Sequence, residues 1–262
     1  MELVLLPTPE DCGRVVADAV IASVTAAQAG GGPVALGLAT GSSPLLAYRE
    51  MQARHRAGEW TADGVRAFLL DEYVGLPAGH PESYREVIRR ECTDELGLEV
   101  HGPDGSAADP VQAAVDYEAQ LQAAGPVAVQ VLGIGGNGHV GFNEPGSSLA
   151  SRTRVKTLTE RTRLDNARFF GDDVEAVPRH VITQGLATIR EARHLVLVAT
   201  GEAKAAAVAD AVEGPVSASC PGSVLQLHPH VTVVVDDAAA SRLARAEYYR
   251  YVLAHKLATQ GW

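Results

Sequence analysis

Aromatic residues are scarce in this sequence of 262 amino acids, at 5% of the chain. Surfaces that stack nucleobases or sugar rings rely on aromatic side chains, so this scarcity disfavours base-stacking folds and lectin surfaces. Lys and Arg are also in the minority, 22 against 32 Asp and Glu, which gives a formal net charge of −10. A chain this acidic is a poor general binder of nucleic acid or anionic membranes. We therefore expect neither partner, and local cations or backbone N–H groups must hold any anionic ligand.

Cysteines are few as well. Cys12, Cys92 and Cys220 are far apart and odd in number, which supports neither a disulfide framework nor a CxxC metal site. No uncharged apolar stretch reaches 18 residues, so we expect no transmembrane helix. Residues 1–7 lack the basic and long apolar regions of a signal peptide. These absences predict a protein of the reducing cytoplasm.

Short apolar runs alternate with helical patterns along the chain. The runs resemble strands that are buried on both faces, as in a parallel sheet covered by helices. They are residues 3–6, 34–38, 67–70, 127–132, 194–199 and 230–235, with residues 181–183 as a weaker candidate. Helices are expected over residues 8–28, 202–213 and 238–257, and from Ser43-Pro44 and Asp109-Pro110. The alternation predicts an α/β fold with a mostly parallel sheet, and we expect one domain spanning residues 1–262.

The first candidate site is the segment Gly37–Pro44, which follows an apolar run and opens a helix. Glycine lets backbone N–H groups face a ligand, and a helix N-terminus favours an anion. The segment is neither a Walker A sequence nor a GxGxxG sequence. The alternative interpretation is a plain strand–helix turn with a serine cap.

Asp71 and Glu72 form the second candidate, because they follow the apolar run 67–70. The carboxyl end of a parallel strand is where ligand sites of α/β folds form. In an extended chain the two carboxylates point opposite ways, so one can face the crevice as a base while the other makes structural bonds. A solvated loop acid or a helix cap is the alternative.

The third candidate is the loop over residues 133–145, in which five of the first nine residues are glycine and surround His139. Such a loop brings backbone close to a ligand, and an imidazole there can exchange protons near neutral pH. Glu144 lies five residues later, within reach to orient the ring or interact with its charge. Although a lone histidine in a loop is usually not catalytic, the glycine density favours a functional site. The segment carries no HExxH or CxxC spacing, so we expect no metal.

Two cations could complete an anion site. Lys204 falls in the first turn of an expected helix, where the helix dipole disfavours a cation and a bound anion would relieve that cost. Arg168 could supply a bidentate fork for phosphate. Pairing of Lys204 with Glu202 or with solvent is an equally good interpretation, and a surface arginine alone says little. The basic run 152–157 is more typical of a solvated face.

In combination these motifs resemble the glucosamine-6-phosphate deaminase family. The matching segments occur in the family's order and cover essentially the whole chain. They are residues 38–44 (LATGSSP), 71–77 (DEYVGLP), 80–84 (HPESY), 138–145 (GHVGFNEP), 151–154 (SRTR) and 225–229 (LQLHP).

The resemblance implies a Rossmann-like α/β fold and the conversion of glucosamine 6-phosphate and water to fructose 6-phosphate and ammonium in amino-sugar catabolism. It implies no cofactor and no metal. The family's enolisation base falls on Asp71, and its ring-opening residues fall on His139 and Glu144. Its phosphate-binding residues fall on Thr40, Gly41, Ser42, Ser43, Arg168 and Lys204.

One position of the catalytic loop varies within the family. Some members carry an aspartate where this chain has Asn137, and others carry asparagine. Asparagine cannot accept a proton or hold charge, so we expect Asn137 to act in the catalytic site by hydrogen bonding alone.

Allosteric members of the family bind N-acetylglucosamine 6-phosphate at a subunit interface. Their motif residues fall on Ser147, Arg154, Lys156 and Thr157 of this chain. The resemblance therefore implies a homo-oligomer, such as a hexamer, that this ligand activates. A family tyrosine near the C-terminus also contributes, but Tyr248, Tyr249 and Tyr251 leave its alignment ambiguous.

Two other functions compete with the deaminase. A 6-phosphogluconolactonase would share the fold and a Gly-x-Gly-His loop, but the runs Asn143–Pro145 and Asp71–Leu76 favour the deaminase. A catalytically silent sugar-phosphate sensor would need a broken catalytic set, whereas Asp71, His139 and Glu144 are all present.

Overall fold

Seven parallel strands form the main sheet of this protein, in the order β1-β10-β9-β6-β2-β3-β5. The computed structural model describes residues 1–262, apart from the side chain of residue 258. The strands are β1 (Glu2–Leu6), β2 (Val34–Leu38), β3 (Val65–Leu69), β5 (Glu99–His101), β6 (Val129–Leu132), β9 (Leu195–Ala199) and β10 (Val231–Asp236). The six apolar runs each contribute one strand, which confirms the expected parallel sheet. The short edge strand β5 was not predicted.

A second, antiparallel sheet has the order β4-β8-β7. Its strands are β4 (Asp71–Tyr73), β7 (Arg154–Thr157) and β8 (His180–Thr183). Only β8 matches an expected strand, the weaker candidate 181–183. The other two have three or four residues with polar members, so no apolar run reveals them, and pairing with β8 makes them strands. Asp71 and Arg154 both pair with Thr183.

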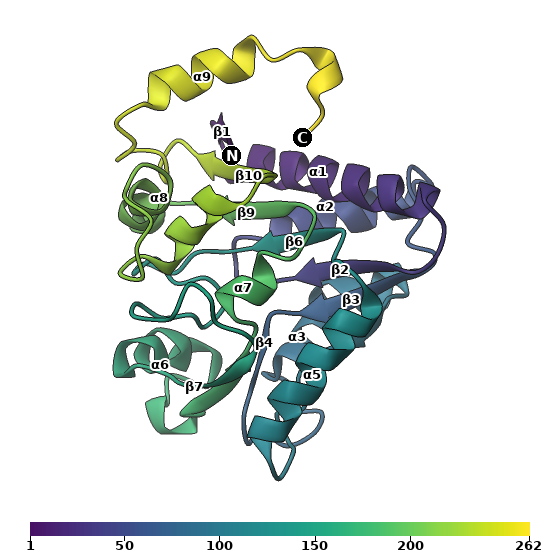
Figure 1. Ribbon diagram of the computed structural model, residues 1–262, viewed down its shortest axis with the longest axis vertical. Coiled ribbons are helices and arrows are strands. Elements are labelled where there is room, and N and C mark those ends of the chain that lie inside the picture. The colour runs from purple at the N-terminus through teal and green to yellow at the C-terminus, as the bar shows by residue number, and fades with distance from the viewer.

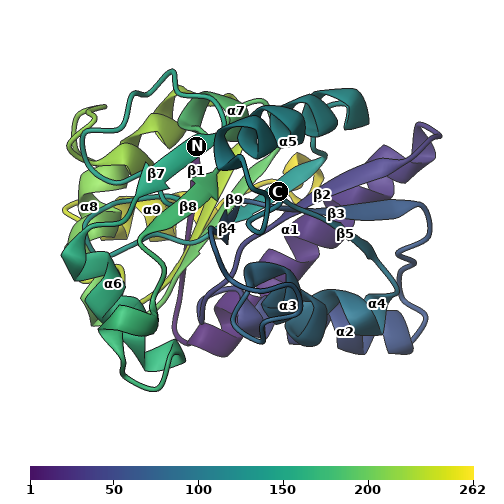
Figure 2. The same cartoon turned by 90° about the horizontal axis from the view of Figure 1, so that it is seen from below.

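Helices cover both faces of the main sheet, with α5 and α7 on one side and α1, α2, α3 and α4 on the other (Figure 2). The helices are α1 (Pro9–Ala29), α2 (Leu45–Arg56), α3 (Tyr84–Ile88), α4 (Asp94–Leu96), α5 (Pro110–Ala124), α6 (Glu160–Asn166), α7 (Leu186–Ile189), α8 (Ala205–Val212) and α9 (Ala246–Ala254). The chain also contains the π-helical segment η1 (Arg89–Thr93) and five 3-10 segments: η2 (Ala167–Phe169), η3 (Val174–Ala176), η4 (Glu202–Lys204), η5 (Pro221–Leu227) and η6 (Ala258–Gln260).

The core lies on the two faces of the main sheet because successive side chains of a strand point to opposite faces. On β2, Leu36 packs with α1 and α2 residues such as Val20 and Met51. The neighbouring Ala35 packs on the other face with Tyr117 of α5. A further cluster on that face joins β6, β9 and β10 to Val208 of α8. Burial on both faces explains the continuous apolar runs of these strands.

Local capping signals explain two helix starts but not a third. The side chains of Thr8 and Asp109 accept backbone N–H groups at the first turns of α1 and α5, and proline follows each of them. The expected serine cap of α2 is wrong: Pro44 occupies the N-cap position, and no side chain caps this helix. The first turn of α2 therefore keeps N–H groups without a side-chain partner.

The two C-terminal helices are shorter than expected. The segment 202–213 begins as the single turn η4 before α8. The expected helix 238–257 forms only over Ala246–Ala254, because side chains satisfy the backbone before it in a turned conformation. Asp236 accepts the N–H of Ala239, and Glu213 accepts the N–H groups of Ala244 and Arg245.

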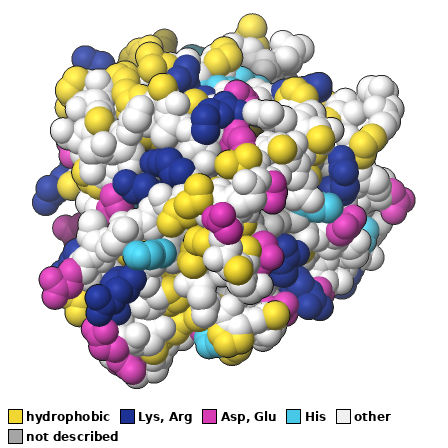
Figure 3. Space-filling model, turned by 60° about the horizontal axis from the view of Figure 1, so that its bottom comes forward, with side chains coloured by type: hydrophobic (Ala, Val, Ile, Leu, Met, Phe, Trp, Pro, Cys, Tyr) yellow, Lys and Arg dark blue, Asp and Glu magenta, His cyan; other side chains and the backbone are white. Residues whose placement is uncertain are grey.

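On the face drawn in Figure 3, Lys and Arg side chains are interspersed with Asp and Glu side chains. This face has no broad basic area of the kind that tracks a nucleic-acid backbone. Among the described residues, no helix has both the length and the apolar character to span a membrane.

Candidate active site

The candidate residues follow four strands that are consecutive neighbours in the main sheet: β9, β6, β2 and β3. Lys204 follows β9, His139 follows β6, Thr40 follows β2 and Asp71 follows β3. The strands are parallel, so their carboxyl ends meet at one edge, where ligands of α/β folds bind. Figure 1 shows α6 and β7 next to each other, on the same side of the molecule as α8. The fold thus brings together residues that are more than 160 positions apart in the sequence.

His139, Asn137 and Glu144 form a connected group in the loop after β6. The Nδ1 atom of His139 lies 3.7 Å from Oε2 of Glu144. The amide nitrogen of Asn137 donates to the same Oε2 at 2.6 Å, while its Oδ1 accepts the backbone N–H of His139 at 3.2 Å. The proximity of Glu144 to the imidazole, which the sequence suggested, is therefore present in the structure.

The carboxylate of Glu144 is strongly held in its ionised form. Its side chain is 6% exposed, and burial alone would raise its pKa. The neighbouring His139 ring and the hydrogen bonds from Thr162 and Asn137 outweigh burial and lower the pKa of Glu144 to about 2. Glu144 therefore carries a negative charge beside the imidazole throughout the neutral range.

A close contact requires glycine at position 135 of this loop, and a positive φ favours it at position 141. A Cβ atom at Gly135 would lie 2.1 Å from Cε1 of the His139 ring, so the ring packs directly on the backbone there. Gly141 has a φ of +56°, and a Cβ atom at this position would lie 3.4 Å from Oδ2 of Asp71. The glycine loop therefore positions the His139 ring and also approaches the carboxylate of Asp71.

Asp71 and Glu72 have different environments, as their alternation along the chain predicts. Glu72 accepts the backbone N–H groups of Tyr73, Tyr84 and Arg85, so it has a structural role at the start of α3. Asp71 is 6% exposed, and burial together with the charge of Glu72 raises its pKa well above the ordinary value. A carboxylate with a raised pKa suits a general base that works near neutral pH.

The segment Thr40–Ser43 joins β2 to the uncapped start of α2. Gly41 has a φ of +106°, a conformation that favours glycine. Tyr48 fixes the backbone just before the segment, because its hydroxyl accepts the N–H of Ala39 and donates to the carbonyl of the same residue. Gly41 and Ser42 are exposed. The geometry suits an anion that accepts the free N–H groups of this turn.

Arg168 lies in η2 and Lys204 in η4, and the fold brings these two cations near each other. Burial and the charge of Arg168 lower the pKa of Lys204, although Asp165 acts in the opposite direction. Within the described part of the chain, neither cation makes an ion pair within 4.0 Å. Arg168 instead places its guanidinium 4.7 Å from the ring centre of Phe169. An anion between the two cations would relieve their repulsion.

Three of the four residues matched to the allosteric motif lie in the small sheet. Arg154, Lys156 and Thr157 belong to β7. Burial lowers the pKa of Arg154, so the basic run 152–157 is not simply a solvated face. Ser147 is buried, and its hydroxyl has no hydrogen-bond partner among the described residues.

Sequence reasoning missed Thr162, whose hydroxyl donates to Oε1 of Glu144. It also missed the aromatic group in which Tyr84 and Asn166 both donate to the hydroxyl of Tyr73. A threonine three residues after Thr159 resembles an ordinary helix start, so no linear signal distinguishes Thr162. Only the approach of α6 to the loop after β6 reveals its partner.

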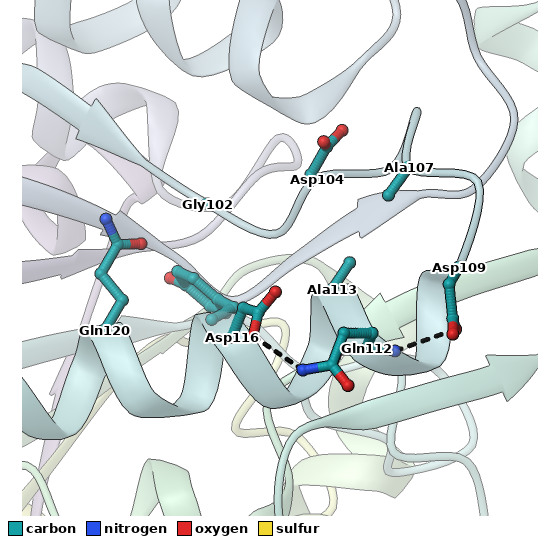
Figure 4. Close-up of a pocket in the computed structure, with 9 residues that line it drawn as sticks. Gly102, Asp104, Ala107, Asp109, Gln112, Ala113, Asp116 and Gln120 are labelled. Atoms are coloured by element: carbon teal, nitrogen blue, oxygen red, sulfur yellow. Dashed lines mark hydrogen bonds between the residues drawn. The ribbon is translucent and has the colours of Figure 1, made fainter.

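A separate pocket of about 570 Å³ lies between the loop after β5 and α5 (Figure 4). Asp104, Asp109 and Asp116 line it, and no Lys or Arg is among its lining residues. Gln112 donates its backbone N–H to Asp109 and its side-chain amide to Asp116. Such an acidic lining is unfavourable for a phosphate ester. Among the described side chains, no group of three or more His, Cys, Asp or Glu is arranged to hold a metal ion.

Comparison with known proteins identifies the family of this chain. The model of the family described as glucosamine-6-phosphate isomerases/6-phosphogluconolactonase matches residues 7–234. The chain belongs to this family. The glucosamine-6-phosphate deaminase of Rhodococcus opacus is 57% identical to it, and that of Streptomyces coelicolor is 55% identical; both alignments cover the whole of each chain.

Solved structures of the family have the same fold. A monomeric glucosamine-6-phosphate deaminase has a TM-score of 0.88 at 35% identity, over 92% of this chain and all of that one. The 6-phosphogluconolactonase of Trypanosoma brucei has a TM-score of 0.75 at 21% identity, over 93% of this chain and 98% of that one. The second likeness is evidence for the fold alone. The expected Rossmann-like fold is confirmed.

Proposed function

We propose that this protein converts glucosamine 6-phosphate and water to fructose 6-phosphate and ammonium, and so serves amino-sugar catabolism. Relatives that are 54–58% identical over their full length carry the name glucosamine-6-phosphate deaminase. The observation that carries the proposal is the approach of the buried carboxylate of Asp71 to Gly141, in the same loop as His139 and Glu144. This arrangement supplies His139 for opening the sugar ring and Asp71 for removing the proton from C2.

His139 acts first in this proposal. Its imidazole takes the proton of the C1 hydroxyl and helps to return a proton to the ring oxygen, which opens the sugar. The imidazolium that forms lies beside the ionised Glu144, 3.7 Å away. Proton transfer by a positioned side chain supplies about 10²- to 10⁴-fold in rate. Asn137 contributes by fixing Glu144 and the backbone of His139 together.

Asp71 acts second as the enolisation base. It removes the C2 proton of the open-chain sugar and returns a proton to C1. The carbonyl oxygen gains a proton and the amino group loses one, so the aldehyde becomes an alcohol and C2 becomes an imine. Water adds at C2, the C–N bond breaks, and ammonium leaves. Because only ionised Asp71 can take the proton, activity should fall as the pH decreases through its raised pKa.

Thr40, Gly41, Ser42 and Ser43 bind the phosphate together with Arg168 and Lys204 in this proposal. The uncapped start of α2 supports this role because its N–H groups lack side-chain partners. The mutual repulsion of the two cations supports it as well. Holding the phosphate far from the reacting carbons orients C1 and C2 toward the catalytic groups.

An ammonium-release assay tests the function. The purified protein is given glucosamine 6-phosphate, and ammonium and fructose 6-phosphate are measured in parallel; one of each should form per sugar consumed. Hydrolysis of 6-phosphogluconolactone is measured as a control. Turnover of the lactone without ammonium release would indicate the lactonase instead, and no turnover of either compound would favour a silent sugar-phosphate sensor.

We further propose regulation by N-acetylglucosamine 6-phosphate, bound by Ser147, Arg154, Lys156 and Thr157 in a homo-oligomer, with a hexamer as the largest expected assembly. The unpartnered hydroxyl of Ser147 and the desolvated guanidinium of Arg154 support a ligand there. Allostery requires different affinities in two states. Sedimentation and rate measurements with and without the ligand test this. A monomer whose rates do not respond to the ligand would contradict it.

A further inference from the structure

Both carboxylate oxygens of Glu144 are held, and the partners come from distant segments. Asn137, in the catalytic loop, donates to Oε2, the oxygen that faces His139. The hydroxyl of Thr162, in α6, donates to Oε1. A carboxylate held at only one oxygen can rotate about its C–C bond, whereas partners at both oxygens fix the direction in which Oε2 points.

The surroundings of Thr162 direct its proton toward Glu144. Thr162 is buried, and its Oγ lies 2.9 Å from the Oγ of Thr159, the N-cap residue of α6. The Thr159 oxygen already accepts the backbone N–H of Thr162. The Thr159 hydroxyl can therefore donate to Thr162, and Thr162 in turn donates to Glu144.

Contacts near both ends of α6 hold the helix that carries Thr162. At its start, Thr159 caps the first turn. Near its end, Asn166 donates to the hydroxyl of Tyr73 at 2.9 Å. Between them, the buried Arg163 donates to the backbone carbonyls of Val174 and Val177. The Thr162 hydroxyl is therefore presented to Glu144 from a fixed position rather than from a free loop.

We propose that Thr162 is a positioning residue that holds the Glu144 carboxylate with Oε2 toward His139. The inference rests on the proposed ring-opening function of His139 and Glu144. The hydroxyl of Thr162 makes its hydrogen bonds to Thr159 and Glu144, so its effect passes through Glu144. Replacing its hydroxyl leaves Oε1 without that hydrogen-bond donor. The ionised form of the Glu144 carboxylate is then less stable, and the carboxylate can turn away from the imidazole.

The test compares three variants. T162V removes the hydroxyl and keeps the shape of the side chain, while T162S keeps the hydroxyl. T188V is a matched control, because the buried Thr188 also donates its hydroxyl to a carboxylate, that of Glu118 in α5. If T162V does not fold, T162A removes the same hydroxyl without a branched side chain and takes its place.

Two measurements separate positioning from general destabilisation. The first is the titration of the Glu144 carboxyl carbon by NMR, assigned with E144Q. In T162V the pKa of Glu144 should rise by about 1 to 2 pH units, and in T188V it should not change. The second is steady-state kinetics at pH 7. In T162V the kcat should fall by about 10- to 100-fold with little change in KM, whereas T162S should retain most of the activity.

Unchanged Glu144 titration together with unchanged kcat in T162V would overturn the inference. An equal loss of kcat in T188V would also overturn it, because the effect would then reflect stability alone. If the unmodified protein releases no ammonium from glucosamine 6-phosphate, the proposed function fails, but the NMR titration still decides whether Thr162 controls the Glu144 carboxylate.

Discussion

The amide nitrogen of Asn137 lies 2.6 Å from Oε2 of Glu144, the same oxygen that faces the His139 ring. The amide oxygen of Asn137 accepts the backbone N–H of His139. A neutral side chain thus connects the imidazole-bearing residue to its carboxylate partner. The sequence left asparagine at this position only the role of hydrogen bonding, and the structure contains these hydrogen bonds.

Replacing Asn137 with aspartate should change the pH dependence. One oxygen of the new side chain can still accept the hydrogen bond from the backbone N–H of His139. The other oxygen would lie against Oε2 of Glu144. Two carboxylates this close cannot both ionise easily, so the pKa of the pair should rise. We expect substantial activity, with the acid limb of the kcat/KM profile moved to higher pH.

Two companion variants test the origin of that shift. N137A removes the hydrogen bond to Glu144 without adding charge, so it should lower activity with a smaller shift of the limb. E144Q should be more damaging than N137D, because no second carboxylate at position 137 can replace the charge of Glu144. A pH profile of folded, active N137D that matches the parent would show that residue 137 is not electrostatically coupled to the ring-opening pair.

Replacing Asp71 with asparagine should abolish enolisation while phosphate binding persists. An amide of nearly the same shape cannot accept the C2 proton, and the substitution leaves the predicted phosphate-binding residues unchanged. Exchange of the C2 proton with deuterated solvent measures this step directly. D116N, at an exposed carboxylate of α5, is the control and should exchange at the parental rate. Parental exchange in D71N would exclude Asp71 as the base.

Replacing Arg168 or Lys204 with alanine should weaken binding of phosphorylated sugars. The loss of one charge-assisted hydrogen bond costs about 1.5–3 kcal/mol, or about 10- to 100-fold in affinity. Calorimetric titration with glucosamine 6-phosphate and with glucosamine separates the contribution of the phosphate. R161A is a matched control, because Arg161 is an exposed arginine of α6 that pairs with Asp165. Equal losses for both sugars would mean that Arg168 and Lys204 do not recognise the phosphate.

Acid should destabilise this protein partly through His194. Its ring is buried between the hydroxyls of Ser23 and Thr232, and it stacks on His230 with 3.7 Å between ring centres. Burial, followed by the charges of His230 and His228, lowers the pKa of His194 to about 3. In the unfolded chain the ring takes up a proton near pH 6.5. Stability is therefore lost as the pH falls from about 6.5 toward 3, by at most about 1.4 kcal/mol per pH unit from this group.

Unfolding by denaturant at several pH values between 7 and 4 measures this contribution. H194Q should be less stable than the parent at pH 7, because it loses the packing and hydrogen bonds of the buried ring. Its stability should, however, depend less steeply on pH. H255Q, at an exposed histidine, should keep the parental slope. The same slope in H194Q and in the parent would assign the acid sensitivity to other groups.

The sequence predicted the main sheet because burial on both faces requires continuous apolar strands, and such runs are visible without a partner. Local capping chemistry likewise located the starts of α1 and α5 at Thr8 and Asp109. The family motifs named Asp71, His139 and Glu144. Asp71 follows β3 and the other two follow β6, and these two strands lie on either side of β2 in the sheet.

Tertiary structure alone decided the small antiparallel sheet, because β4 and β7 acquire their strand character from pairing with β8, more than 20 residues from either strand. It also decided the partners of Glu144. Asn137 is seven residues away in the same loop, but Thr162 is 18 residues away on α6, and no periodicity links a threonine to a distant carboxylate. Local patterns record which face of an element is buried, whereas the packing of elements determines which polar groups meet.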